Sequence, residues 1–286
     1  MSTIEKALNK FKSGQKKATS QEVVESNRFK IPSSPAPSAS SEASQIELPW
    51  IQMQSKGMLT PQDGRSAIAE EMRMIKQPLL KKAFSDKSSG TKHNNLVMVS
   101  SSVPGEGKSF TSINLAISFA MELDKTVLLI DADVAKPSIA KYLDFVPGKG
   151  LVDYLLGDVS LQEAFLKTDL PNLTILPAGK QHHYSTELLS SESMNNLLDE
   201  LSERYSDRIV IFDSPPLLAT SEAKVLANKM GQVVIVVEAV KTTESLLKDA
   251  LSKIPNANIT GLILNKSRFK SSAAQYGYGY YGAQDK

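Results

Sequence analysis

The chain has 286 residues, and its 33 Lys and Arg against 31 Asp and Glu give a formal net charge of +2. Because the charge is nearly balanced and forms no long basic stripe, we expect no nucleic-acid partner. The sequence contains no cysteine, which excludes disulfide bonds and thiolate metal sites and suits a cytoplasmic protein. No apolar run approaches the roughly 20 residues that cross a bilayer.

The first 59 residues predict an extension before the main domain. Residues 1–30 carry seven Lys or Arg against three Glu and open with a capping box and a short amphipathic pattern of Ile4, Ala7, Leu8 and Phe11. This segment could contact anionic lipid or a partner protein, or could be a frayed terminus. Residues 31–46 are rich in Ser, Pro and Ala and predict a flexible linker. The segment around Trp50 gives no interpretable pattern.

The main domain is predicted to span residues 60–270. A helical pattern begins at Thr60-Pro61, runs to Leu80 and is interrupted at Pro78. Apolar runs of strand length then alternate with helical patterns, which predicts an α/β fold with a parallel sheet and helices on both faces. The predicted strands are 96–101, 126–131, 173–176, 208–213, 232–238 and 259–264. The predicted helices are 108–122, several between about 137 and 168, 187–204, 220–229 and 243–253.

The first of these strands leads into a glycine-rich turn, Pro104-Gly105-Glu106-Gly107-Lys108-Ser109. This arrangement is typical of a phosphate-binding loop. Glycines at 105 and 107 let backbone N–H groups face phosphate oxygens, Lys108 would neutralise the β- and γ-phosphates, and the Ser109 hydroxyl is placed to ligate Mg²⁺. The pattern therefore predicts a nucleoside triphosphate ligand in a P-loop NTPase-type fold.

The match to the common phosphate-loop pattern is imperfect, because that pattern has glycine where this chain has Ser102. A chance glycine turn is the alternative. The predicted ATP-binding residues of this region are Pro104, Gly105, Glu106, Gly107, Lys108, Ser109 and Phe110.

Two other predicted strands end on carboxylates. Val127–Ile130 runs into Asp131 and Asp133, and Ile209–Phe212 runs into Asp213. The carboxyl ends of central parallel strands form the ligand site in such folds, so we expect the three acidic groups to converge on one nucleotide. Each aspartate could instead only cap the next helix.

Tyrosines gather at the end of the chain, in residues 271–286, at Tyr276, Tyr278, Tyr280 and Tyr281 among glycines. A tail this rich in glycine cannot form a stable helix or strand by itself. Composition alone would allow an inert terminus. Behind an ATP site, however, such tyrosines resemble phosphate acceptors.

Together these features resemble the cytoplasmic domain of bacterial tyrosine autokinases, P-loop kinases that accompany polysaccharide chain-length regulators. The chain is more closely similar to the free-standing form found with exosortase-linked exopolysaccharide loci, whose opening Ile4-Glu5-Lys6-Ala7-Leu8 it shares. The resemblance spans residues 60–286. It rests on Pro104–Ser109, Asp131-Ala132-Asp133, Asp213-Ser214-Pro215-Pro216 and the terminal tyrosines.

The resemblance implies an ATP-dependent autokinase that phosphorylates the tyrosine tail in trans and regulates exopolysaccharide polymerisation and export. By that resemblance, Lys108 and Ser109 bind phosphates and Mg²⁺, while Asp131 and Asp133 activate the tyrosine hydroxyl and help to hold the metal. Asp213 would position Mg²⁺ through water. Asn265 matches the asparagine on the adenine side, although it could also be a turn cap.

Two positions depart from the family pattern. The membrane-fused kinases carry arginine after the second aspartate, whereas the nearest cation here is Lys136. The helix before the first strand should read Glu-x-x-Arg-x-x-Arg for subunit packing, and this chain has Glu70, Arg73 and Lys76, which loses the bidentate fork at the third place. A ring-shaped homo-oligomer is implied, and an exposed, charged helix face is the alternative.

The resemblance also implies partners: a separate membrane chain-length regulator as activator, a tyrosine phosphatase, and recruitment to the inner face of the cytoplasmic membrane. The first alternative function is a partitioning or division-site ATPase switch. Such proteins place a lysine five residues before the loop lysine, where this chain has Val103. The second alternative is an ATP-dependent scaffold without kinase activity.

Overall fold

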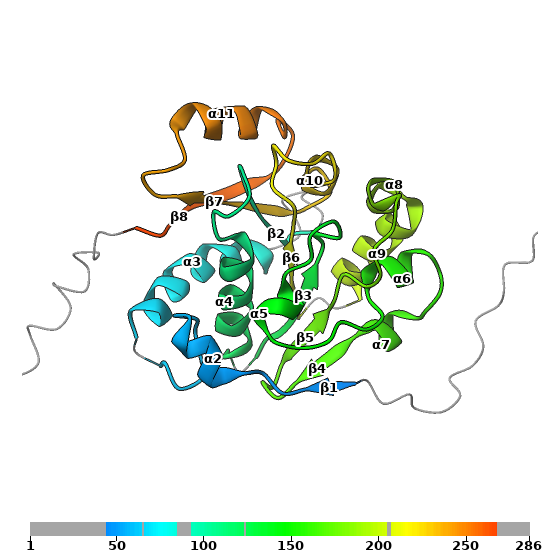
Figure 1. Ribbon diagram of the computed structural model, residues 1–286, viewed down its shortest axis with the longest axis horizontal. Helices are drawn as coiled ribbons and strands as arrows, with labels where there is room; N and C mark the ends of the chain where they lie inside the picture. The colour runs from blue at the N-terminus through cyan, green and yellow to red at the C-terminus, as the bar shows by residue number, and fades with distance from the viewer. Residues whose placement is uncertain (1–43, 65, 85–92, 123, 205–206, 268–286) are drawn as a thin grey trace, which may run out of the picture. The chain divides into compact units, whose positions relative to one another are not determined.

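The computed structural model describes residues 44–64, 66–84, 93–122, 124–204 and 207–267. These residues form a sheet of eight strands in the order β1-β4-β5-β3-β6-β2-β7-β8, between two layers of helices (Figure 1). The strands are β1 (Gln45–Ile46), β2 (Leu96–Ser101), β3 (Thr126–Asp131), β4 (Leu166–Thr168), β5 (Leu173–Leu176), β6 (Arg208–Asp213), β7 (Gln232–Glu238) and β8 (Ile259–Asn265).

The helices before β4 are α2 (Trp50–Ser55), α3 (Ala67–Ala83), α4 (Lys108–Ala120), α5 (Ile139–Tyr142), α6 (Leu151–Leu155) and α7 (Leu161–Ala164). Those after it are α8 (Ser185–Ser190), α9 (Glu192–Glu203), α10 (Glu222–Ala227) and α11 (Glu244–Ser252). The predicted α/β fold of P-loop type, with a parallel sheet and helices on both faces, is confirmed, apart from one antiparallel pair, β4 with β5.

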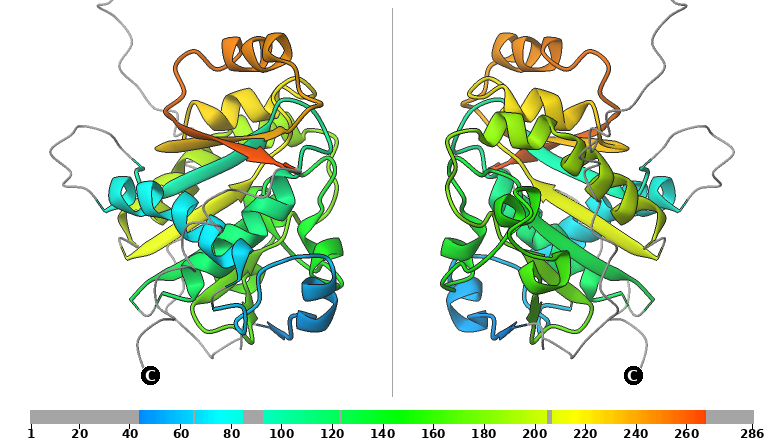
Figure 2. Two further views of the ribbon diagram at one scale, coloured as in Figure 1. Left: turned by 90° about the vertical axis from the view of Figure 1, so that its left-hand side faces the viewer. Right: turned by 90° about the vertical axis from the view of Figure 1, so that its right-hand side faces the viewer.

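Each face of the sheet carries its own apolar core. Helices α2 to α5 cover one face and α6 to α11 the other (Figure 2). The first group packs with Val97 and Val99 of β2, and the second packs with Leu96 and Met98 of the same strand. Strand β2 is buried along its whole length, and β3 and β6 are buried except at their first residue. These are the continuous apolar runs in the sequence, as strands covered on both faces require.

Three local predictions were wrong. The region 137–168 contains a strand besides helices, because Leu166 pairs with Ile175 in an antiparallel hairpin with β5. Helix α3 starts at Ala67 instead of Thr60, since the amide and hydroxyl of Thr60 donate to the Asp63 carboxylate and close a turn first. Pro78 does not interrupt α3. It removes one helical hydrogen bond at an exposed position while its neighbours stay packed.

Residues 45–59, which we assigned to the N-terminal extension, pack against the sheet and α4, and we call them the N-terminal strap. Strand β1 pairs with β4 in the last two residues of the predicted linker. Asp169 accepts hydrogen bonds from the Leu48 amide at 3.0 Å and from Trp50 Nε1 at 2.7 Å. Met53 and Met58 are buried. The N-terminal strap therefore covers the edge of the sheet at β4.

The predicted N-terminal helix and the tyrosines at 276, 278, 280 and 281 lie outside the described residues. Among the helices of the described ranges, none has the length and apolar character that crossing a membrane requires.

Candidate active site

The glycine-rich turn joins β2 to α4, and its backbone shape explains its glycines. Gly105 and Gly107 have φ of 91° and 102°, the left-handed region that favours glycine. A Cβ built on Gly107 would lie 2.0 Å from Asn265 Nδ2, so the position also needs the missing side chain. Ser102 is not among the residues with positive φ, and its departure from the common pattern therefore brings no backbone strain.

The structure brings Lys108 and the three predicted aspartates together at the carboxyl ends of β2, β3 and β6. Lys108 Nζ lies 2.8 Å from Asp133 Oδ2 and 3.9 Å from Asp213 Oδ1. Asp131 and Asp213 are register partners on neighbouring strands. The exposed fractions of Asp131, Asp133 and Asp213 are 1%, 4% and 0%. Three carboxylates thus share a buried pocket with one ammonium group.

This crowding changes the pKa of three groups. Burial is the largest influence on Lys108 and would lower its pKa, but the carboxylates of Asp213, Asp133 and Asp131 together raise it above the ordinary value. Burial, followed by the charge of Asp213, raises the pKa of Asp131 to about 7. Burial also raises the pKa of Asp213, against the opposing charge of Lys108. The pocket contains more negative charge than it can hold ionised without further cations.

Serine hydroxyls complete the pocket, and two of them, those of Ser112 and Ser138, were not identified as site residues from the sequence. The Ser138 hydroxyl donates to Ser109 Oγ at 2.7 Å and lies 3.4 Å from Asp213 Oδ2. The Ser112 hydroxyl lies 3.2 Å from Asp213 Oδ1. The Ser138 and Ile139 amides donate to Asp131 Oδ2. Ser112 follows Lys108 by one helical turn, a spacing that could have indicated it, whereas nothing in the sequence singled out Ser138.

The donor set fits Mg²⁺ bound with a nucleotide. Asp131 Oδ1 is buried without a hydrogen-bond partner among the described residues, and the Ser109 hydroxyl and Asp213 lie in the same pocket. Within the described ranges, no three His, Cys, Asp or Glu side chains could hold a metal ion by themselves. Mg²⁺ requires no such group, since it is bound through one or two carboxylates, phosphate oxygens and waters.

Glu106 points into the turn and is 1% exposed. Its carboxylate accepts a hydrogen bond from the Val103 amide at 2.8 Å and another from the Thr242 hydroxyl, in the connection after β7. The Glu106 side chain therefore holds the loop in shape.

The end of β8 supports the same turn. Asn265 Nδ2 donates to the Glu106 carbonyl at 2.9 Å, and Lys266 Nζ donates to the Gly105 carbonyl at 2.7 Å. Lys266 also forms an ion pair with Glu238 at 3.2 Å. The glycine turn is thus fastened to the strand from which the tyrosine tail continues.

The glycine turn opens into a cleft of about 590 Å³, which we call the P-loop cleft. Pro104 and Phe110 line it together with Asp133, Asn265 and Lys266. Lys136, the nearest replacement for the family arginine, and Tyr142 also lie on its wall. A cleft of this size accommodates a drug-sized or nucleotide-sized ligand.

The three residues predicted for subunit packing differ in their accessibility. Glu70 and Arg73 are exposed and form an ion pair with each other on α3. Lys76 is 5% exposed, donates to the Ser118 carbonyl at 2.8 Å and pairs with Glu122 at 2.5 Å. Lys76 therefore joins α3 to the end of α4 within the chain, which leaves Glu70 and Arg73 available to a partner.

Comparison with known proteins agrees with this geometry. The family described as AAA domain matches residues 95–259. Tyrosine-protein kinase YwqD of Bacillus subtilis strain 168 is 36% identical over 192 residues, which cover 66% of this chain and 78% of the relative. The succinoglycan biosynthesis transport protein ExoP of Rhizobium meliloti strain 1021 is 33% identical over 208 residues, 71% of this chain and 25% of the relative.

Among solved structures, the VpsO kinase domain is 32% identical with a TM-score of 0.57, and the match covers 71% of this chain and 100% of that one. The chain spans about a quarter of the length of several curated relatives that it matches. The fold and the glycine turn thus define a P-loop nucleotide-binding domain. Within that class, the chain belongs to the family of bacterial tyrosine-protein kinases.

Proposed function

We propose that this chain transfers the γ-phosphoryl group of ATP to tyrosine hydroxyls in its own tail, at Tyr276, Tyr278, Tyr280 and Tyr281. The observation that carries the proposal is the convergence of Lys108, Ser109 and three buried aspartates on the mouth of a P-loop. Phosphoryl transfer depends mainly on positioning and charge neutralisation, and this pocket offers both.

The residues divide the work by their surroundings. The amides of the turn and Lys108 would bind the phosphates. Bound Mg²⁺, held by Ser109, Asp131 and Asp213, would supply charge neutralisation. The tyrosine oxygen would form the new bond to phosphorus while the bond to the β-phosphate oxygen breaks and ADP leaves. Asp131 and Asp133 would be the carboxylates that take the phenolic proton.

The tail would reach the site of a neighbouring copy within a ring-shaped homo-oligomer that uses Glu70 and Arg73 of α3. Both side chains are about half exposed and pair only with each other in the salt bridges of the described residues. Because the relative ExoP is named for polysaccharide transport, we propose a role in regulating exopolysaccharide polymerisation or export. A membrane chain-length regulator would recruit and activate the chain at the inner face of the membrane, and a tyrosine phosphatase would reset it.

Mass spectrometry of the chain after incubation with Mg-ATP tests the proposal. Phosphate is expected on the tail of the parent and not on that of a Lys108→Met variant whose unfolding curve is unchanged. Mixing Lys108→Met chains with active chains whose four tail tyrosines are Phe tests transfer between copies. Phosphate on the Lys108→Met tail supports it, and a phosphate-free tail in that mixture contradicts it.

The same incubation separates the alternatives. ATP hydrolysis without phosphotyrosine would indicate an ATPase switch, and ATP binding with neither activity would indicate a scaffold. Either result would overturn the kinase proposal.

A further inference from the structure

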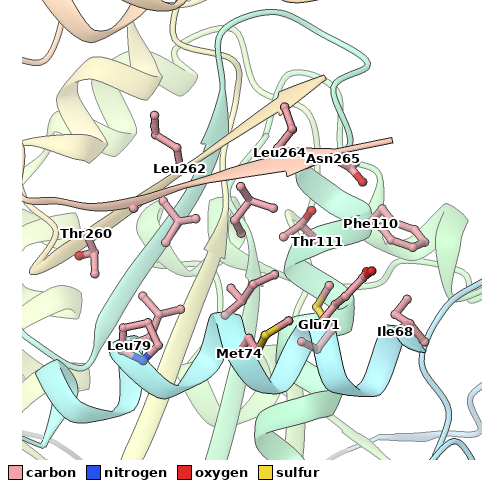
Figure 3. A pocket seen from close by; sticks show the side chains of 16 residues that line it. Ile68, Glu71, Met74, Leu79, Phe110, Thr111, Thr260, Leu262, Leu264 and Asn265 are labelled. Atoms are coloured by element: carbon pink, nitrogen blue, oxygen red, sulfur yellow. The ribbon is translucent and has the colours of Figure 1, made fainter. Parts of the chain in front are cut away.

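A second cavity, of about 460 Å³, lies between α3 and β8 (Figure 3). We call it the β8 groove. Its walls are mainly apolar, and they include Ile68, Met74, Ile75 and Pro78 of α3, Phe110 of α4 and Ile263 of β8. Glu71, Thr111 and Thr260 add polar groups to its lining. Met74 is 60% exposed. Burying this apolar surface against another segment would therefore lower the free energy.

Strand β8 forms one wall of this groove and is also the last strand of the sheet. Among the described residues it pairs only with β7, so its other edge presents unpaired backbone groups. Leu262 and Leu264 lie on the side of β8 away from α3 (Figure 3), where they are 52% and 64% exposed. An edge of seven residues, apolar on both faces, is a template for another strand.

The chain itself supplies a segment of matching chemistry. Beyond Lys266, which is fastened to the Gly105 carbonyl at the end of the groove, residues 271–284 contain no charged side chain. Within them, Tyr276, Tyr278 and Tyr280 alternate with Gly277 and Gly279. In an extended strand this spacing places three tyrosines on one face and two glycines on the other.

We propose that residues 275–281 of the same chain dock antiparallel to β8 as an added edge strand, with the alternating tyrosines in the β8 groove. The nine residues 266–274 span up to roughly 30 Å, sufficient for the chain to turn back along β8. Tyrosine suits a groove whose body is apolar and whose rim offers Glu71 and Thr260, because its ring is apolar and its hydroxyl is not. The glycine face leaves room for Leu262 and Leu264.

Docking by the same chain is favoured over docking by another molecule because the short connection keeps the segment at high local concentration. Pairing with β8 also compensates for the weak strand propensity of glycine, since β8 supplies the partner strand that an isolated tail lacks. The amphipathic segment 4–11 is a poorer candidate, because Lys6 and Lys10 would accompany it into an apolar groove.

The proposal adds a regulatory consequence that rests on the proposed kinase function. A phosphate adds about −1.5 to −2 charges per tyrosine, and the apolar groove cannot accommodate such a group without a large desolvation cost. The groove would therefore bind only the unmodified tail and withhold it from neighbouring active sites, and each phosphorylated tail would stay released.

Hydrogen–deuterium exchange on the full chain without ATP tests docking independently of catalysis. Amides of residues 275–281 and of the outer edge of β8 should exchange at least about tenfold more slowly than in a Met74→Glu variant, because a docked segment exchanges only through its open fraction. Gln77→Glu, which adds the same charge at an exposed position of α3 that does not line the groove, is the matched control. Unprotected tail amides in the parent, or equal effects of both variants, would overturn the proposal.

Two tail variants sharpen the test. Replacing the four tyrosines with Phe should keep the protection, and replacing them with Glu should remove it. Equal protection in both contradicts tyrosine docking. A photo-crosslinker at position 74 in a mixture of light and heavy chains should join to residues 271–286 of its own chain. Crosslinks to residues 271–286 of another copy or to residues 1–30, without crosslinks to the tail of the same chain, would assign the groove to a different occupant and refute the proposal.

Finally, the Met74→Glu variant should phosphorylate its tail faster than the Gln77→Glu control. If docking is seen in the exchange experiment but no variant incorporates phosphate, the kinase proposal fails while the docking proposal stands.

Discussion

The P-loop cleft and the β8 groove share Phe110 and Asn265 as wall residues but differ in chemical character. At the cleft, Lys108 interacts with three buried carboxylates, of which Asp133 lines the cleft wall. The groove leaves Met74 exposed, beside an edge of β8 that has no partner strand among the described residues. Each is unfavourable for the free chain, and each would be relieved by a ligand of opposite character: cations in the cleft, a neutral apolar segment in the groove. Substitutions should therefore affect the two surfaces separately.

The largest expected effect belongs to Lys108→Met. Loss of the ammonium group removes the main positive charge in the cleft, so autophosphorylation should fall by at least about 10³-fold, or roughly 4 kcal/mol of transition-state stabilisation. Phosphotyrosine formation measures the activity, and hydrogen exchange of β8 should remain as in the parent. Full activity in a folded Lys108→Met chain would disprove the role of the turn, and altered β8 exchange would show that the two surfaces are coupled.

Asp131→Asn should lower activity strongly and yet stabilise the chain without nucleotide at high pH. The folded pKa of about 7 lies above the ordinary 3.8, so the folded state binds the extra proton between these values. The stability from that proton is complete below pH 3.8 and is lost as pH rises through 7. The variant, which cannot ionise, should gain up to about 4 kcal/mol relative to the parent at pH 8 and little at pH 4.

Urea unfolding at both pH values, without Mg²⁺ and nucleotide, measures this difference. Asp249→Asn, in the exposed part of α11, is a control that should show no such dependence on pH. Equal stability of the Asp131→Asn variant and the parent at pH 8 would contradict the assignment of an unfavourable buried charge.

Glu106→Gln should weaken ATP binding by about tenfold. An amide can replace only one of the two acceptor oxygens that bond the Val103 amide and the Thr242 hydroxyl, and a lost hydrogen bond of this kind is worth about 1.5 kcal/mol. Equilibrium binding of ATP measures the loss. The exposed Glu244→Gln on α11 should bind ATP as the parent does, and equal affinity in both variants would place the Glu106 side chain outside the function of the loop.

The smallest expected effect is that of Arg73→Ala on assembly. Its guanidinium is about half exposed and pairs with Glu70, so removal should cost little stability, at most about 0.5 kcal/mol. If α3 is the contact between copies, light scattering should show fewer oligomers at the same concentration. Gln77→Ala, on the same helix, is the control, and unchanged assembly in the Arg73→Ala chain would exclude that contact.

The sequence predicted the cleft better than the groove because of how each is encoded. Lys108 and Ser109 lie in one continuous turn, and Asp131 and Asp213 end apolar runs, so local patterns and the rule for parallel strands located them. Ser138 joins them only because the chain after β3 returns over Ser109. The groove pairs α3 with a strand about 190 residues later in the chain, and no local pattern records such a meeting.

The same distinction between local patterns and contacts made on folding explains where α3 begins and where Lys76 lies. Thr60 and Asp63 formed a turn where a helix pattern was predicted, because side-chain hydrogen bonds compete with helix formation. Lys76 had the spacing of an exposed interface residue, but its ammonium group lies at the Ser118 carbonyl, a contact that depends on the packing of α3 against α4.

The N-terminal strap has a practical consequence for preparing a smaller form of this protein. Met53 and Met58 are 0% and 1% exposed, and the Leu59 amide donates to Asn114 Oδ1 of α4 at 2.6 Å. A recombinant fragment starting at residue 60, where sequence patterns place the domain, would strip both methionines from the core, each worth about 1.5–3 kcal/mol of burial. It would also leave the Asn114 carbonyl without that donor. Cloning boundaries for crystallisation therefore belong before Ser44.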